Sequence, residues 1–514
     1  MTFIKNNFEK SYFKVINQQT DKMFLIFVDD AGTRNRYTYN QFNCDVDKVI
    51  DVITVLDAKN SFEACIFLSE NSYELIVYIF AVLLSGKIAI FINPNEDDIY
   101  IEEQIKKISS TRLILSDRPR SHCQSTIMSI PDKINFSKKT KKRKVKNINN
   151  DFIYVLTSGS TGQSKFVRLS ERSLLVNIEA LIQHHDLYKK KIIIGTALPL
   201  FHVNALGFSL MTTFFSGGQL VLWKKFNILN FFQIMKDERI QIYSAIPSIL
   251  SAIGHFAKST KNTYLKYLNY FVSAATYLPA HVCMRIHLIT HKKIIQGYGL
   301  SEAVNFSCLL PINISAKNYK KLMLDSKYPS IGKSIFGNEV TVISDDGQIC
   351  QSDQIGELYI KGLSLMTGYL HEKESIIDSI NGLPTGDLGY FQIIEGEKYF
   401  FLTGRRKDII KKNGETIGLR DIEERIASAD INGFDFIIVP FESKAHVEEI
   451  GLIYILSKKL EINWLEKLED ILKTLTLNRR PKKCIEIKNL KIRTPSGKPL
   501  RWKFRYLFEN NRNS

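Results

Sequence analysis

A short polar segment, TSGSTGQSK, has the composition of a phosphate-binding loop. Its glycines allow the backbone to approach a ligand closely, its hydroxyls and amides can donate hydrogen bonds to phosphate oxygens, and Lys165 adds positive charge. Lys165 comes three residues after the last glycine instead of directly after it, which disfavours a Walker-type kinase or NTPase. A flexible turn is the alternative when the segment is taken alone. The residues expected to contact phosphate are Thr157, Ser158, Gly159, Ser160, Thr161, Gly162 and Lys165.

Six further segments place polar or charged side chains among glycines and apolar residues. Taken alone, each has an ordinary structural interpretation: His202 could be a packed core histidine, Glu302 could begin a helix, and Asp387 could belong to a turn. Their order and spacing along the chain, together with the loop, are what indicate one function. The segments are PLFHVNAL (199–206), VSAATYLP (272–279), QGYGLSEA (296–303), PTGDLGY (384–390), GRRKDIIKKNGETI (404–417) and TPSGKPLR (494–501).

In this order, the seven segments resemble those of the adenylate-forming superfamily, which includes acyl-CoA synthetases, aryl-CoA ligases, luciferases and adenylation domains. The resemblance spans nearly the whole chain. It departs from the family pattern at Ser164, which replaces a proline of the phosphate loop, and at Ala274 and Tyr277, which replace a glycine and a proline of the adenine loop. The change at Ser164 removes no hydrogen-bond donor, so we expect activity to be retained.

The resemblance implies a site for ATP and Mg²⁺. Tyr298 would stack on the purine, Asp387 would accept both ribose hydroxyls, Arg405 would bind ribose and phosphate, and Glu302 would hold Mg²⁺ directly or through water. The turn around Gly414 would line a thiol channel. The remaining residues expected to contact the nucleotide are Ala274, Ala275, Thr276, Gly299 and Ser301.

The same resemblance implies the catalytic and acyl-binding residues. Lys498 would enter the adenylation site, and His202 would close over the acyl pocket. Amino-acid-activating members carry an aspartate at the position of His202, so an α-amino acid is disfavoured as substrate. The expected pocket walls are mainly apolar with one amide, which favours a medium aliphatic or an aromatic acid. These wall residues are Val203, Asn204, Ala275, Gly297 and Val304.

The expected reaction has two steps. A carboxylic acid and ATP first form an acyl-adenylate and pyrophosphate, and a small domain then turns about Lys407 so that a phosphopantetheine thiol can attack. We favour CoA as the acceptor, because FHVNAL is most like the acyl- and aryl-CoA ligases; an acyl-carrier protein in trans is the alternative. A catalytically inactive basic binding protein is a third hypothesis, which the intact Lys498, Glu302, Asp387 and Arg405 argue against.

The elements that must position these residues follow an α/β pattern. Apolar runs typical of buried strands, at 64–68, 88–92, 112–115, 192–198, 219–223 and 294–295, alternate with helical spacing at 72–84 and 170–184. After Arg405 the charge density rises. We therefore predict a large N-terminal domain of stacked α/β subdomains over residues 1–405 and a small mobile α+β domain over residues 406–514, which carries Lys498.

The bulk composition agrees with a soluble cytoplasmic enzyme. The formal charge of +17 favours polyanions such as nucleotides, CoA or an acidic carrier protein. The dense basic run Ser137–Lys146 is read as a solvated linker rather than a nucleic-acid patch, so no nucleic acid is expected as a partner. Seven cysteines without a CxxC pair indicate a reducing compartment, and the chain shows neither a signal peptide nor an apolar run long enough for membrane insertion.

Overall fold

The structure is a computed structural model of the chain. It describes residues 6–108, 111–119, 127–130, 151–157, 164–189, 192–257, 262–372, 374–431, 433–443, 448–457, 460–488, 490–494 and 497–509. Two features predicted from the sequence lie outside these residues: the centre of the phosphate loop, Ser158 to Gly162, and the basic run Ser137–Lys146. Within the described residues, no helix is long and apolar enough to cross a membrane.

The first of two large sheets is mostly parallel and holds the start of the phosphate loop. Two of its central strands are fully buried apolar runs, ACIFL at residues 64–68 and IAIF at residues 88–91, as expected for parallel strands covered on both faces. β7 ends at Thr157, and β8 begins at Lys165 and pairs with β7 in antiparallel fashion. The strand order is β18 (Gly368–Tyr369), β8 (Lys165–Ser170), β7 (Asp151–Thr157), β4 (Ile88–Phe91), β3 (Ala64–Leu68), β5 (Arg112–Ser116) and β6 (Ile127–Ser129).

The second large sheet has nine strands and a parallel centre from β1 to β13. Its order is β15 (Lys333–Ser334), β14 (Cys308–Leu309), β13 (Lys293–Tyr298), β12 (Tyr270–Ser273), β11 (Ile242–Ala245), β9 (Ile193–Thr196), β10 (Gln219–Trp223), β1 (Met23–Val28) and β2 (Arg34–Thr38). One hydrophobic core cluster joins the two sheets and the helices between them. The predicted α/β fold class is confirmed.

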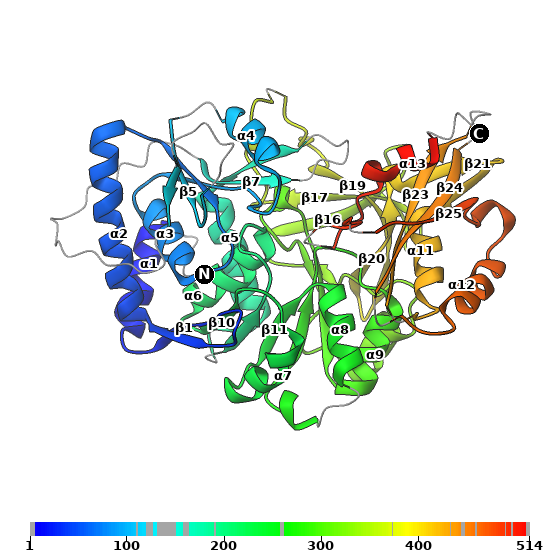
Figure 1. Cartoon of the computed structure of the whole chain (residues 1–514), viewed down its shortest axis with the longest axis horizontal. Helices are drawn as coiled ribbons and strands as arrows, with labels where there is room; N and C mark the ends of the chain where they lie inside the picture. The colour runs from blue at the N-terminus through cyan, green and yellow to red at the C-terminus, as the bar shows by residue number, and fades with distance from the viewer. Residues whose placement is uncertain are drawn as a thin grey trace.

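Helices connect and cover these strands (Figure 1). The two helices predicted at 72–84 and 170–184 are present, and each begins with a serine cap: Ser72 accepts from the backbone N–H of Leu75, and Ser170 accepts from that of Ser173. The helices of this part are α1 (Phe8–Gln19), α2 (Tyr39–Asn60), α3 (Tyr73–Leu84), α4 (Asp98–Lys106), α5 (Glu171–His184), the π-helix η1 (Asn204–Thr212), α6 (Thr213–Ser216), α7 (Ile228–Asp237), α8 (Pro247–Ala257), α9 (Ala280–Thr290) and α10 (Ala316–Tyr319).

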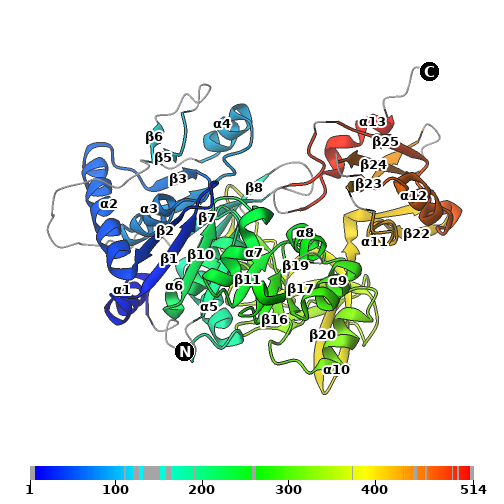
Figure 2. The same cartoon turned by 60° about the horizontal axis from the view of Figure 1, so that its bottom comes forward.

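A four-stranded antiparallel sheet follows, and then a small lobe that Figure 2 shows at one end of the molecule. The sheet consists of β16 (Asn338–Ile343), β17 (Gly356–Gly362), β19 (Leu383–Ile394) and β20 (Glu397–Arg405). The lobe consists of the hairpin β21 (Ile409–Lys412) and β22 (Glu415–Gly418), helices α11 (Leu419–Ala427), α12 (Trp464–Lys473) and α13 (Tyr506–Glu509), and the sheet β23 (Phe434–Glu442), β24 (Glu448–Leu456) and β25 (Lys483–Glu486).

Hydrophobic packing separates this lobe from the rest. Among the described residues, the core cluster of the antiparallel sheet ends at Leu402, and the two clusters of the lobe begin at Ile410. The predicted boundary between residues 405 and 406 falls in this interval, and its exact position stays a prediction.

Helix α11 carries polar contacts between the lobe and the rest of the chain. The Arg420 guanidinium lies over the rings of Tyr277 and Tyr328, at 4.0 and 4.7 Å from their centroids. Lys327 pairs with Asp421 at 2.7 Å. Burial raises the pKa of Glu424 to about 7, so this carboxyl holds a proton more readily than an exposed glutamate. The lobe is thus docked through charged and aromatic groups that can separate into water.

Candidate active site

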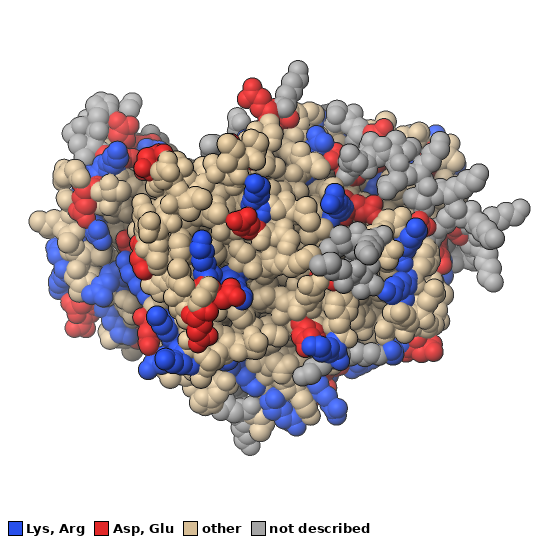
Figure 3. Space-filling view, turned by 180° about the vertical axis from the view of Figure 1, so that it is seen from behind, with Lys and Arg blue, Asp and Glu red and all other residues tan. Residues whose placement is uncertain are grey.

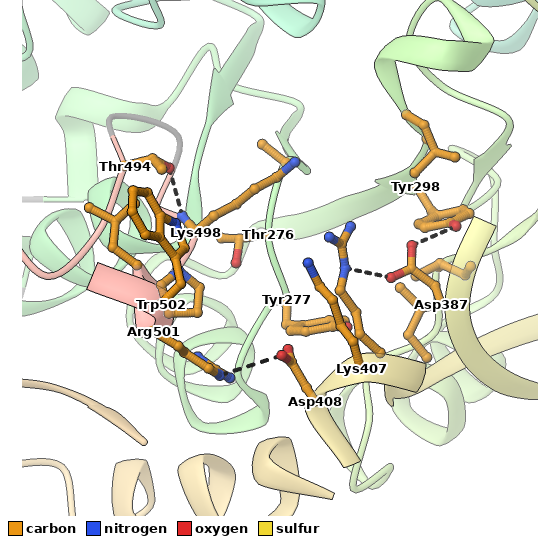
Figure 4. Close-up of a pocket in the computed structure, with 18 of the residues that line it drawn as sticks. Thr276, Tyr277, Tyr298, Asp387, Lys407, Asp408, Thr494, Lys498, Arg501 and Trp502 are labelled. Atoms are coloured by element: carbon orange, nitrogen blue, oxygen red, sulfur yellow. Dashed lines mark hydrogen bonds and ion pairs between the residues drawn. The ribbon is translucent and has the colours of Figure 1, made fainter. Parts of the chain in front are cut away.

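A cavity of about 300 Å³ lies between the antiparallel sheet, the end of β13 and the small lobe. Figure 4 shows side chains from these three parts converging on it. We call it the larger cavity. Residues predicted from the sequence that line it are Ala275, Thr276, Gly297, Tyr298, Gly299, Asp387, Arg405, Lys407 and Lys498.

One wall of the larger cavity is built by a carboxylate with two partners. Asp387 on β19 and Arg405 on β20 are cross-strand neighbours, and the Nε of Arg405 donates to Asp387 Oδ1 at 2.8 Å. The hydroxyl of Tyr298, at the end of β13, donates to Asp387 Oδ2 at 2.8 Å. The Asp387 residue is only 2% exposed, so these bonds fix its orientation. A carboxylate offers about four acceptor positions, so this one can still accept from a vicinal diol.

The opposite wall of the larger cavity carries Lys498 (Figure 4). A turn holds this residue: its backbone N–H donates to the Oγ1 of Thr494 at 3.0 Å, and its carbonyl accepts from the backbone N–H of Thr494 at 2.8 Å. Gly497 in the same turn packs against Thr276, because a Cβ added there would lie 3.3 Å from the methyl carbon of Thr276. The turn of the small lobe thus docks directly on the predicted adenine loop.

The lining of the larger cavity contains more lysine and arginine side chains than carboxylates. Burial first, and then the charge of Arg405, lower the pKa of Lys498, against the opposing effects of Glu302 and Asp387. The pKa of Lys407 is lowered to about 8 by partial burial and by Arg405. These lysines would regain their ordinary pKa beside an anion, so the cavity is suited to a polyanionic ligand.

On the outer surface, charge is not concentrated in this way. Figure 3 shows basic side chains scattered among acidic ones over the face it presents. The net charge of +17 therefore does not form one continuous basic field on that face.

A second cavity, of about 100 Å³, adjoins the larger one, and we call it the smaller cavity. The two share four lining residues, which are Ala275, Gly299, Leu300 and Lys498. Lys498 thus reaches the point where the two cavities meet. Predicted residues that line the smaller cavity alone are Thr157, His202, Val203, Asn204, Ala274 and Ser301.

His202 in the smaller cavity is a neutral imidazole. Its pKa is lowered to about 4, first by burial and then by the charge of Lys498. Its Nε2 is buried and has no hydrogen-bond partner among the described residues.

We call the residues common to both cavities, Ala275, Gly299, Leu300 and Lys498, the shared wall. Its shape depends on a close approach of two backbone segments. A Cβ added to Gly299 would lie 1.5 Å from the carbonyl oxygen of Asn305, so only glycine fits there. Val304 has a φ of +64°, which a β-branched residue rarely adopts, and Ala275 has a φ of +75°. Strain of this kind persists where surrounding packing enforces it, often at binding sites.

Glu302 lies beside this wall and fits a magnesium site. Tyr369 donates to Glu302 Oε1 at 2.9 Å, which occupies one of about four acceptor positions of the carboxylate. Glu302 is close enough to Lys498 to influence its pKa. Mg²⁺ needs few protein oxygens when phosphates supply the rest, so one carboxylate here suffices. No cluster of three or more metal-binding side chains occurs among the described residues.

Four predicted residues lie elsewhere than in the cavity walls: Glu302, described above, and Lys165, Gly414 and Val304. The Lys165 ammonium pairs with Glu372 at 2.6 Å and lies 4.8 Å from the centroid of the Tyr369 ring. Gly414 is exposed at the turn between β21 and β22. Val304 is buried in the core behind the shared wall. Gly297, expected beside the acyl group, lines the larger cavity instead of the smaller one.

Asn305 and Phe306 are among the residues of the smaller cavity that sequence reasoning missed. They follow QGYGLSEA and Val304 directly, and the positive φ of Val304 redirects the chain there. The available signal was an asparagine and a phenylalanine one residue beyond the motif. Sequence reasoning also missed Arg501, which lines the larger cavity and pairs with Glu423 at 2.9 Å.

Comparison with known proteins agrees with this geometry. A sequence model of the AMP-binding enzyme family matches residues 12–370. The chain is 26% identical over 370 residues to "4-coumarate--CoA ligase-like 6" of Arabidopsis thaliana, an alignment that covers 69% of this chain and 62% of that protein. It is 24% identical over 501 residues to "Probable CoA ligase CCL5" of Humulus lupulus, covering 92% and 88% of the two chains.

The fold also matches that of a solved structure, ATP-bound MatB from Rhodopseudomonas palustris. The TM-score is 0.81 at 19% identity, and the match covers 99% of this chain and 100% of that one. Fold and cavities thus define an adenylate-forming enzyme of two domains. The chain belongs to the AMP-binding enzyme family.

Proposed function

We propose that this chain activates a carboxylic acid with ATP and then transfers the acyl group from the acyl-adenylate to the thiol of CoA. The observation that carries the proposal is the position of Lys498 at the junction of the two cavities. A nucleotide in the larger cavity and a carboxylate in the smaller one would meet beside its ammonium. Relatives that are named CoA ligases support the choice of acceptor.

The first half-reaction brings two anions together, so positive charge at the reacting centre would supply much of the catalysis. Lys498 would stabilise the charge that develops on the α-phosphate as the acid attacks and pyrophosphate leaves. Asp387 would accept from the ribose hydroxyls, with Arg405 and Tyr298 holding its orientation. The neutral His202 would border the acyl group without adding charge.

Glu302 would hold the magnesium ion of Mg-ATP, which neutralises phosphate charge when bound. Tyr369 would orient the Glu302 carboxylate through its hydrogen bond. Thr157 would begin the phosphate loop, since it lines the smaller cavity at the end of β7 and its hydroxyl donates to the carbonyl of Lys165 at 3.2 Å.

For the second half-reaction, we propose that residues 406–514 rotate about Lys407. Lys498 would leave the site, and the exposed turn at Gly414 would enter it and line the path of the thiol. The contacts of α11 support this proposal, because a charged group such as Arg420, which lies over the Tyr277 ring, can be hydrated when the two parts separate. The six described cysteines are all free, which fits a cytoplasmic enzyme.

The test is acid-dependent pyrophosphate release with Mg-ATP, measured across aliphatic, aryl, hydroxy and amino acids with and without CoA. We expect release with one class of acid and acyl-CoA only when CoA is present. Release without acyl-CoA formation would instead indicate a carrier protein as acceptor. Absence of release with every acid would overturn the proposal, provided that the chain remains folded.

A further inference from the structure

Tyr277 lies where the nucleotide side of the site meets the small lobe. It lines the larger cavity, among the side chains that Figure 4 shows. Its ring also contacts the lobe, because the Arg420 guanidinium lies 4.0 Å from the ring centroid. Tyr277 precedes the predicted boundary and Arg420 follows it, so this contact joins two parts of the chain that are proposed to move apart. It is also a position where the adenine loop departs from the family pattern, which has a proline there.

Arg420 makes two more contacts with the part of the chain that precedes the boundary. Its guanidinium lies 4.7 Å from the centroid of the Tyr328 ring, and its Nη1 donates to the carbonyl of Leu402. The Arg420 residue is only 3% exposed. A guanidinium removed from water over aromatic faces is attracted to them more strongly than an exposed one. A rotation of the lobe would break this interaction, since all three partners would stay behind.

The other polar contacts of this interface are weaker anchors. Glu424 accepts from the backbone N–H of Ala280, but burial raises its pKa to about 7, so near neutral pH it carries only part of a charge. Two ion pairs each include a side chain that is at least 44% exposed, so water and salt screen their attraction. These pairs are Lys327 with Asp421 and Arg285 with Asp430.

We propose that Tyr277 is a positioning residue that holds the lobe, through Arg420, in the orientation that places Lys498 at the junction of the two cavities. The proposal rests on the proposed function, because it assigns to this contact the balance between the two half-reactions. A cation–π contact of this kind shifts an equilibrium by about 2- to 30-fold. That is enough to favour one orientation and little enough to be broken in each turnover.

The ratio of the two half-reaction rates measures this balance. Adenylate formation is proportional to the population with Lys498 in the site, and transfer to CoA is proportional to the population with the lobe rotated. Loss of the contact should therefore lower the ratio of the first rate constant to the second by about 2- to 30-fold, whichever orientation is the more populated. Mere damage to the fold would lower both rate constants and leave their ratio unchanged.

Two variants remove the contact from opposite sides, Tyr277→Leu and Arg420→Leu. Each should lower the ratio in single-turnover assays of adenylate formation from Mg-ATP and of transfer from the preformed adenylate to CoA. The assays use the acid that releases pyrophosphate fastest. Arg420 does not line the larger cavity, so its variant leaves the nucleotide contacts intact. The double variant should match the single ones instead of adding to them.

Two further variants serve as controls. Tyr277→Phe should keep the wild-type ratio, because it keeps the ring, and the hydroxyl that it removes has no partner among the described residues. Arg425→Leu should also keep it, because Arg425 lies on the same helix but its Nε donates to Thr474 Oγ1 inside the lobe, at 3.0 Å. If Arg420→Leu does not fold, the comparison of Tyr277→Leu with Tyr277→Phe decides alone.

The outcomes separate this inference from the function on which it rests. A wild-type ratio in both leucine variants, an equal fall in Tyr277→Phe, or additive effects in the double variant would overturn the positioning role and leave the ligase function standing. Absence of pyrophosphate release from the unaltered enzyme with every acid would overturn both.

Discussion

Replacing Gly299 by alanine should impair the larger and the smaller cavity at once. The added Cβ would lie 1.5 Å from the carbonyl oxygen of Asn305 and 2.5 Å from its carbonyl carbon, whereas ordinary contacts of a Cβ begin near 3.4 Å. The two backbone segments must therefore separate by about 2 Å. Gly299 lines both cavities, so this movement displaces the wall against which both substrates of the proposed reaction would rest.

The magnitudes follow from that displacement. Overpacking of a close contact costs ~1–3 kcal/mol of stability, which the protein should survive. Misplacement of catalytic groups by ~1 Å can cost ~100-fold in rate, so kcat/KM for the acid should fall by at least that factor. The KM for ATP should rise as well, because the same residue adjoins the nucleotide side.

Steady-state pyrophosphate release measures the activity, and thermal unfolding measures the stability. Gly418→Ala is the matched control: Gly418 has a negative φ of −81°, and the nearest atom to an added Cβ is 4.0 Å away. If Gly299→Ala retained the kcat/KM of that control, the close approach of Gly299 to Asn305 would not exist in the active enzyme, and our account of the shared wall would be refuted.

Three further predictions address the other groups. Lys498→Ala should abolish adenylate formation and spare transfer from a preformed adenylate, and Lys407→Pro should do the reverse; equal loss of both half-reactions in single-turnover assays would contradict this division. Asp387→Asn removes a charged acceptor from the ribose wall, so the KM for ATP should rise by about 10- to 100-fold while the KM for the acid changes little; a parallel rise in both would contradict the assignment. The pKa of Glu424 is about 7 in the folded chain, above its ordinary value of 4.5, so the stability it contributes is full below about pH 4.5 and is lost as the pH rises through about 7. Glu424→Gln should therefore raise the melting temperature at about pH 8 and have little effect at about pH 5, and a shift independent of pH would exclude this cause.

The sequence was sufficient to predict the α/β class and many of the element positions. Strand β3 and strand β10 have the predicted bounds because each is a short apolar run between polar turns. The strand predicted at 294–295 extends to Tyr298, because Gly297 and Tyr298 pair with β14, a long-range contact that local pattern cannot reveal. Interactions between distant segments set the ends of elements more than local propensity does.

The candidate site, like the fold, was predicted in part from the sequence. Ordered motifs brought Lys498, His202 and Asp387 to attention, and the structure gathers them around adjoining cavities although they lie far apart in the chain. The size of the smaller cavity was beyond sequence reasoning. It depends on how Phe306 packs against Gly297, and the sequence shows neither the contact nor the turn at Val304 that produces it.

The pairing of Asp387 with Arg405 across β19 and β20 has a consequence for the fate of the intermediate. Both residues precede the predicted boundary, whereas Lys498 follows it. A rotation of residues 406–514 would withdraw the lysine and leave the carboxylate and the guanidinium in place. A nucleotide held by that pair would stay anchored during the rotation, so a labile acyl-adenylate would be retained between the two half-reactions instead of escaping to hydrolysis.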